Sequence, residues 1–150
     1  MQKNKDIKYM SLALKEANKA YEKNEIPVGC IIVHKDKVIA KAHNLKESKQ
    51  KATAHAEILA IEKASEKLGN WRLDSCDLYV TLEPCPMCAS AIIQSRIKKV
   101  VIAALDNKDG AVVSSKHIFE NNHNHRLIVK TKVMEKESKN IIYKFLKEKR

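Results

Sequence analysis

The chain has 150 residues, four cysteines and a formal net charge of +11. This length allows one hydrophobic core, so we expect a single domain over residues 1–150. No apolar run is long enough to span a membrane, and the first ten residues lack the apolar stretch of a signal peptide. With so few cysteines, the sequence predicts a reducing, cytoplasmic location without disulfides or membrane contact.

The first half of the chain predicts two helices and a β-hairpin. Apolar residues recur at helical spacing over residues 6–23, which indicates an amphipathic helix whose apolar side, including Ile7 and Met10, is buried. Residues 28–34 and 38–42 form two extended segments around a turn. Residues 46–51 are expected to form a polar, basic loop. A second helix begins near His55 and ends at Gly69.

The second half alternates strands and helices. Residues 77–83 show the period-2 pattern of a strand, and Pro86 begins a third helix that continues to about residue 94. A continuous apolar run at 100–105 then completes a right-handed βαβ unit with a parallel strand pair. A short helix at 115–120, a strand at 127–133 and a terminal helix from about Met134 complete an α/β fold.

Three residues have the side chains and spacing of a catalytic zinc site. His55 and the two cysteines of a Cys-x-x-Cys segment, Cys85 and Cys88, supply one nitrogen and two sulfur ligands. Such a set suits Zn²⁺ and leaves its fourth tetrahedral position open for water. Glu57 can carry protons to and from that water without being a ligand. Residues at i and i+2 lie about 200° apart in mid-helix, so His55 and Glu57 can converge only at a helix start.

Each half of this pattern has a simpler explanation on its own. A Cys-x-x-Cys segment is also typical of a redox pair or of half a structural zinc site, and Glu57 alone could merely stabilise a helix start. A structural site needs a fourth ligand, whereas Cys30 and Cys76 stand apart and are expected to be reduced, buried thiols. The combination of His-x-Glu with Pro-Cys-x-x-Cys resembles the signature of zinc-dependent nucleobase deaminases.

Beyond this motif, the sequence resembles bacterial tRNA-specific adenosine deaminases over nearly its whole length. The matching segments are residues 25–29, 44, 53–58, 79–88, 95–97, 106–111 and 124–126. The resemblance implies a cytidine-deaminase-like fold of three layers, α-β-α, with a mixed five-stranded sheet. It also implies a homodimer whose tRNA site includes the partner subunit, with one Zn²⁺ per subunit. The implied reaction is hydrolytic deamination of the wobble adenosine of an arginine tRNA to inosine.

The same resemblance implies roles for the matched residues. The implied zinc ligands are His55, Cys85 and Cys88, with Glu57 as the catalytic proton shuttle. Asn44 would hydrogen-bond the flipped adenine, and Val28 and Ala54 would line its pocket. Asp106 and Lys108 would contact the neighbouring anticodon nucleotides. The sequence departs from the family pattern at residues 102–105, where a glycine and a polar residue are expected, and its terminal helix is less arginine-rich.

The positive charge predicts attraction to a polyanion. In the terminal helix, apolar residues fall on one side and basic residues on the other, which gives either a phosphate-binding stripe or an ordinary solvated face. The basic residues are Lys136, Lys139, Lys147 and Arg150. Three functions remain open: a tRNA wobble-adenosine deaminase, a deaminase of a free base or nucleotide (guanine, cytosine or a riboflavin precursor), and a non-enzymatic, zinc-stabilised RNA-binding module. Glu57 argues against the last, because a structural site has no use for it.

Overall fold

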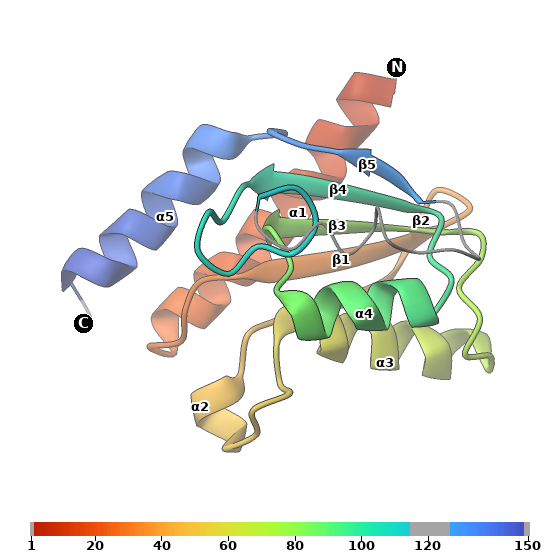
Figure 1. Ribbon diagram of the computed structural model, residues 1–150, viewed down its shortest axis with the longest axis horizontal. Coiled ribbons are helices and arrows are strands. Elements are labelled where there is room, and N and C mark those ends of the chain that lie inside the picture. Colours follow the sequence, from red (N-terminus) through yellow and green to blue (C-terminus); the bar gives the residue numbers. More distant parts are fainter. Residues whose placement is uncertain (1, 115–126, 149–150) are drawn as a thin grey trace.

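The strands form one mixed sheet between two layers of helices (Figure 1). The computed structural model describes residues 2–114 and 127–148. The strand order is β2-β1-β3-β4-β5. Helices α3 and α4 cover one face of the sheet, and α1 and α5 lie on the other. The three-layer α/β fold with a mixed five-stranded sheet is therefore confirmed.

The sheet joins an antiparallel half to a parallel half. Strands β1 (Gly29–His34) and β2 (Lys37–His43) form the predicted hairpin, and β3 (Cys76–Leu82) pairs antiparallel with the other edge of β1. Strand β4 (Lys99–Ala104) pairs parallel with β3, and β5 (Ile128–Lys130) pairs parallel with β4. The parallel pair and the helix that crosses between its strands confirm the βαβ unit.

Both faces of the sheet are buried, because alternate strand residues point to opposite helix layers. Ile32, Leu78 and Val80 belong to the core under α3 and α4. Ile31 and Tyr79 belong to the core on the other face, under α1. Cores on both sides fix the register of each strand, since a slip by one residue would exchange the two sets of side chains.

Within the described residues, four long or medium helices frame the sheet. They are α1 (Gln2–Glu22), α3 (Ala56–Leu68), α4 (Pro86–Gln94) and α5 (Glu135–Glu148). Helix α1 approaches β1 at Gly29, where an added Cβ would lie 1.9 Å from the carbonyl oxygen of Ala13. Helix α3 ends at Gly69 in the left-handed conformation, and α4 begins with Pro86, as the sequence predicts. None of the described helices is both long and apolar enough to span a membrane.

The structure corrects three predictions of local structure. The predicted basic loop at 46–51 contains a short helix, α2 (Lys46–Lys49). The predicted strand at 127–133 is limited to Ile128–Lys130. Ile7, assigned to the buried side of α1, is 41% exposed, whereas Asp6 is 1% exposed. Asp6 is buried because it accepts a hydrogen bond from Tyr79 and pairs with two lysines. The predicted helix at 115–120, the segment 124–126 and Arg150 lie outside the described residues.

Candidate metal centre and substrate pocket

Two helix starts meet at the carboxyl end of β3. His55 is the N-cap residue of α3, and Cys85 is the N-cap residue of α4, with Cys88 in the first turn that follows. The Nδ1 atom of His55 lies 3.7 Å from the Sγ atom of Cys85 and 3.5 Å from that of Cys88. These three atoms all lie within 4.8 Å of one another. The structure thus brings together the three residues that the sequence predicts as metal ligands.

The donor set fits zinc. With usual Zn–N and Zn–S bond lengths, two ligands of a tetrahedral site lie about 3.6 Å apart, close to the two separations found here. Cys30 and Cys76 are buried free thiols, as predicted, and neither belongs to this group. Among the described residues no fourth histidine, cysteine or carboxylate joins the group, which leaves the fourth position open for water or substrate, as in catalytic rather than structural zinc sites.

The pKa values of the two thiols in this group are shifted in opposite directions. Hydrogen bonding from Cys88, followed by that from His55, lowers the pKa of the Cys85 thiol to about 4. The interaction with Cys85, together with burial, raises the pKa of Cys88 far above its ordinary value. The Cys85 thiol therefore loses its proton more readily than that of Cys88, and a divalent cation bound to both sulfurs would displace the remaining proton.

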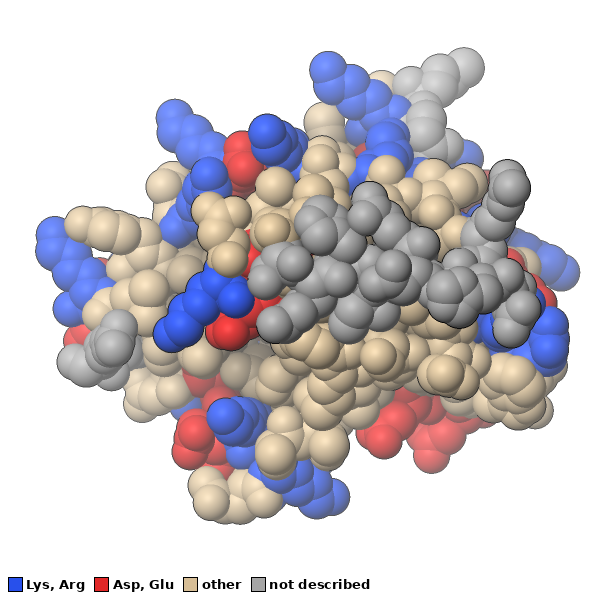
Figure 2. Space-filling view, in the orientation of Figure 1, with Lys and Arg blue, Asp and Glu red and all other residues tan. Residues whose placement is uncertain are grey.

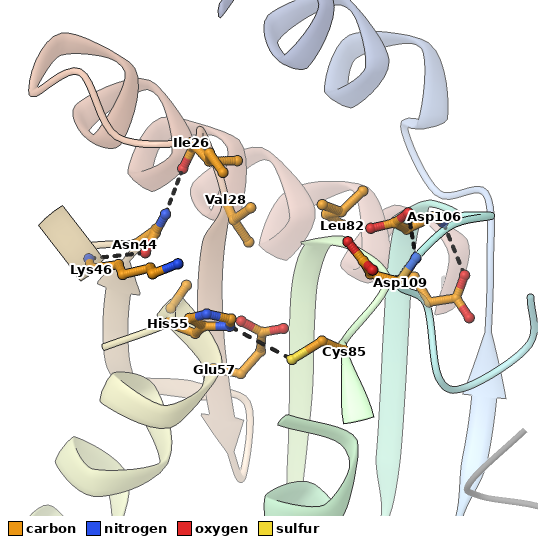
Figure 3. A pocket seen from close by; sticks show the side chains of 12 residues that line it. Ile26, Val28, Asn44, Lys46, His55, Glu57, Leu82, Cys85, Asp106 and Asp109 are labelled. Atoms are coloured by element: carbon orange, nitrogen blue, oxygen red, sulfur yellow. Dashed lines mark hydrogen bonds between the residues drawn. The ribbon is translucent and has the colours of Figure 1, made fainter. Parts of the chain in front are cut away.

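Glu57 lies in the first turn of α3, two residues after His55, where the two side chains converge. It is 4% exposed, and its carboxylate points toward Cys85 (Figure 3). Burial is the largest influence on its pKa, which is raised to about 7. A carboxyl group with this pKa can both take up and release a proton near neutral pH.

A cavity of about 250 Å³ opens above these residues. Its walls come from the segments just before β1 and just after β2, from α2, from the start of α3, from the end of β3 and the residues that follow it, and from the loop after β4. The lining residues are Ile26, Val28, Asn44, Lys46, His55, Ala56, Glu57, Leu82, Glu83, Cys85, Asp106 and Asp109. The volume lies just below the roughly 300–1,000 Å³ typical of sites for drug-sized ligands, which suits a single nucleobase.

The expected substrate-binding residues are only partly gathered around this cavity. Val28, Asn44 and Asp106 line it. Ala54 is 2% exposed and Lys108 is exposed, and neither is a lining residue. The backbone N–H of Lys108 donates to the Asp106 carboxylate at 3.1 Å, so it helps to shape the turn that carries Asp106.

Asn44 is held from both ends of its side-chain amide. Its Nδ2 atom donates to the carbonyl oxygen of Ile26 at 3.3 Å, and its Oδ1 atom accepts from the N–H of Lys46 at 3.1 Å (Figure 3). An amide has two donor hydrogens and two acceptor lone pairs. One donor and one acceptor position therefore remain for a ligand, and the side chain is already oriented.

Two buried glutamates that the sequence analysis did not single out support the cavity walls. Glu83 accepts hydrogen bonds from the N–H groups of Asp106 and residues 112–114 and from the hydroxyl of Ser114. Glu25 accepts from the N–H groups of Glu47 and Ser48 and from the Ser48 hydroxyl. These bonds cross more than twenty residues of sequence, so no local pattern indicates them.

Comparison with known proteins places this site in a family. Residues 3–104 match the cytidine and deoxycytidylate deaminase zinc-binding region, and the chain belongs to that family. Within it, the chain groups with the tRNA-specific adenosine deaminases. That of Bacillus subtilis (strain 168) is 46% identical over 144 residues, which are 95% of this chain and 89% of the relative.

Solved structures agree with this placement. One, from work on A-to-I editing by tRNA deaminases at the wobble position of transfer RNA, is 44% identical, with a TM-score of 0.84, and covers 88% of this chain and 96% of its own. A guanine deaminase from Nitrosomonas europaea has a TM-score of 0.80, covering 91% of this chain and 81% of its own. At 22% identity, that likeness shows the shared fold alone.

Proposed function

We propose that this protein converts the wobble adenosine of a tRNA, that of an arginine tRNA in particular, to inosine by hydrolytic deamination. The observation that carries the chemistry is the buried Glu57 beside the cluster of His55, Cys85 and Cys88, with Glu57, His55 and Cys85 lining one cavity. The choice of substrate is supported by the similarity to tRNA-specific adenosine deaminases along nearly the whole chain.

The three clustered side chains would hold one Zn²⁺ per subunit. Bound there, zinc would act as a Lewis acid that makes water nucleophilic at neutral pH. Glu57 would take a proton from the attacking water and deliver it to the ring nitrogen that needs it as aromaticity is lost. It would then take the second proton of that water, from the hydroxyl now on the ring carbon, and pass it to the departing amine, so that adenosine and water give inosine and ammonia.

The cavity walls would bind and orient the base. Asn44 would use its remaining donor and acceptor positions on the polar edge of the adenine, and Val28 would contact the ring face. Asp106, at the rim, would contact a neighbouring anticodon nucleotide. Ala54 and Lys108 would act less directly, Ala54 by packing behind the pocket and Lys108 from the solvent side of the Asp106 turn.

Several features support a polyanionic partner. Lysine and arginine side chains project from the rim of the molecule, over α5 and over α2, in the face that Figure 2 shows. Lys136, Lys139 and Lys147 on α5 are exposed, while Ile141, Ile142 and Phe145 on the same helix are half-buried. This distribution suits a helix that packs against α1 and offers its basic side to tRNA backbone.

The proposal also covers the domain organisation, the oligomeric state and the cellular location of the protein. We infer that residues 1–150 work as one domain, since the described strands all join one sheet. We further propose a homodimer in which the partner subunit completes the tRNA site, and a cytoplasmic location, where mature tRNA is found.

The test is a comparison of substrates. The purified protein is incubated with total tRNA and, separately, with guanine, cytosine and a pyrimidine precursor of riboflavin, and inosine and released ammonia are measured. We expect inosine at the wobble position of tRNA and no ammonia from the small molecules. Faster turnover of a free base would favour the small-molecule deaminase, and binding of tRNA without any inosine would favour a non-enzymatic RNA-binding module.

A further inference from the structure

The cavity has two walls of unlike charge. The loop after β4 carries the carboxylates of Asp106 and Asp109, whereas the opposite wall carries Asn44 and Lys46 (Figure 3). Lys46 extends from α2 toward the space above His55, and it is the only lysine or arginine among the described residues that line the cavity. None of the ion pairs between described residues involves Lys46. Its charge is therefore available to a ligand.

The backbone that carries Lys46 is fixed. Its N–H donates to Asn44 at 3.1 Å, and its carbonyl accepts from the N–H of Lys51 at 3.1 Å. The next two N–H groups along the chain donate to Glu25 at 3.1 and 2.6 Å, and Glu25 is only 1% exposed. A buried carboxylate thus fastens α2 to the body of the protein. The lysine side chain starts from a set position, although its tip is free to adjust.

The charge distribution restricts how a strand of RNA can cross this cavity. A nucleotide within a chain has one phosphate on each side of its ribose. When its base enters toward His55 and Glu57, both phosphates stay near the rim. The Asp106 and Asp109 side repels a phosphate, while the Lys46 side attracts one. Lys46 and Asp109 are exposed, so this preference comes from the sign of the charges at the rim.

We propose that Lys46 binds one of the two phosphates that flank the target nucleotide and so fixes the direction in which the strand crosses the cavity. This inference rests on the proposed function, because a free base has no phosphate to bind. Lys49 lies on the same short helix and is exposed but does not line the cavity. It belongs to the solvated side of α2 and serves as the matched control.

The test combines protein variants with a modified substrate. The zinc-loaded full-length protein, Lys46→Gln and Lys49→Gln are each assayed on an anticodon stem-loop. The stem-loop is used with natural phosphates and with an uncharged methylphosphonate at the phosphate 5′ or 3′ to the target adenosine. Lys46→Gln should lower kcat/KM on the natural stem-loop roughly tenfold, as expected for loss of a hydrogen bond to a charged group. Lys49→Gln should match the wild type.

The decisive result is the coupling between the two changes. One of the two methylphosphonates should cost the wild type and Lys49→Gln about tenfold, and should cost Lys46→Gln almost nothing further. The contact would be ruled out if each methylphosphonate lowered kcat/KM by the same factor in Lys46→Gln as in the wild type. If the wild type forms no inosine even in the natural stem-loop, the proposed function itself fails, and this outcome differs from a failure of the Lys46 contact alone.

Discussion

The backbone N–H of Asp106 donates a hydrogen bond of 3.0 Å to the buried carboxylate of Glu83. The same carboxylate accepts from three further N–H groups and from the hydroxyl of Ser114, so one side chain just beyond β3 fixes the loop on one side of the cavity. Glu25 fixes α2 on the other side in the same way. Both walls of the pocket are thus held by hydrogen bonds to buried carboxylates.

Replacing Glu83 tests this support through its dependence on pH. Burial alone would raise the pKa of Glu83, but hydrogen bonds from Ser114 and the loop backbone hold it below its ordinary value of 4.5. A carboxyl group whose pKa is lower in the folded state contributes stability above its unfolded pKa and loses that contribution as pH falls through the folded pKa. We expect Glu83→Gln to lower the free energy of unfolding by about 1–3 kcal/mol at pH 7.

The measurement is urea unfolding of the wild type and of Glu83→Gln at several pH values. The difference between them should be full at pH 7 and shrink as the pH falls below about 4.5. Glu62→Gln, an exposed change on α3, should have little effect at any pH. A difference that is the same at all pH values would show that the charge of Glu83 does not matter.

Glu57 offers a test of the proton shuttle. Glu57→Gln keeps the size and polarity of the side chain but cannot take up or release a proton at neutral pH. We expect it to retain its zinc and its fold and to lose deamination by several orders of magnitude. Zinc content is measured by atomic absorption, and activity by inosine formation. Substantial remaining activity would rule out the assigned role.

The cysteines provide a matched pair for the metal site. Cys88→Ala removes a side chain of the three-ligand cluster, so we expect loss of zinc and of thermal stability together. Cys76→Ala removes a thiol that is equally buried but lies outside the cluster. It should retain zinc and lose only the stability expected for a small core cavity. Equal zinc content in both variants would contradict the proposed ligand set.

The sequence predicts the elements whose apolar residues recur at a regular spacing, and it predicts the site residues that lie at helix starts. Alternating apolar residues locate the hairpin and β3, and the motif residues His55 and Cys85 lie at the helix starts where their chemistry requires them. Helix α2 is missed because its four polar residues have no apolar period. It is stabilised by Glu25, more than twenty residues away.

Polar contacts between residues far apart in the sequence also explain the other features that the sequence does not predict. Asp6 is buried on α1 in place of Ile7 because Tyr79 and lysines from β4 and β5 surround its carboxylate. The sequence of α1 alone does not indicate that these residues will lie beside Asp6. The role of Glu83 is hidden for a similar reason, since its partners are N–H groups of the backbone, which carry no sequence signal.

Asn44 is proposed to read the base, but it also holds the backbone of Lys46. Asn44→Ala should lower kcat/KM on tRNA roughly ten- to hundredfold, the cost of leaving a buried partner unpaired, with zinc retained. Asn44→Asp keeps the oxygen that accepts from Lys46 but loses the amide donor. If Asn44 reads the base, both variants lose activity. Recovery in Asn44→Asp would assign the residue to loop support alone.

The basic side of α5 tests whether its charge is placed for tRNA or merely solvated. If Lys136, Lys139 and Lys147 contact phosphates, each contact releases counterions, so log affinity should fall linearly with log salt by about 0.7–0.9 per phosphate. Replacing all three with glutamine should flatten that slope and weaken tRNA binding, with zinc content and turnover of bound tRNA nearly unchanged. Three exposed lysines far from α5 make a control triple with the same change in net charge. They are Lys35 and Lys37 at the hairpin turn and Lys67 in the last turn of α3. Equal effects from the two triples would mean that only the total charge attracts tRNA, and that α5 has an ordinary solvated face.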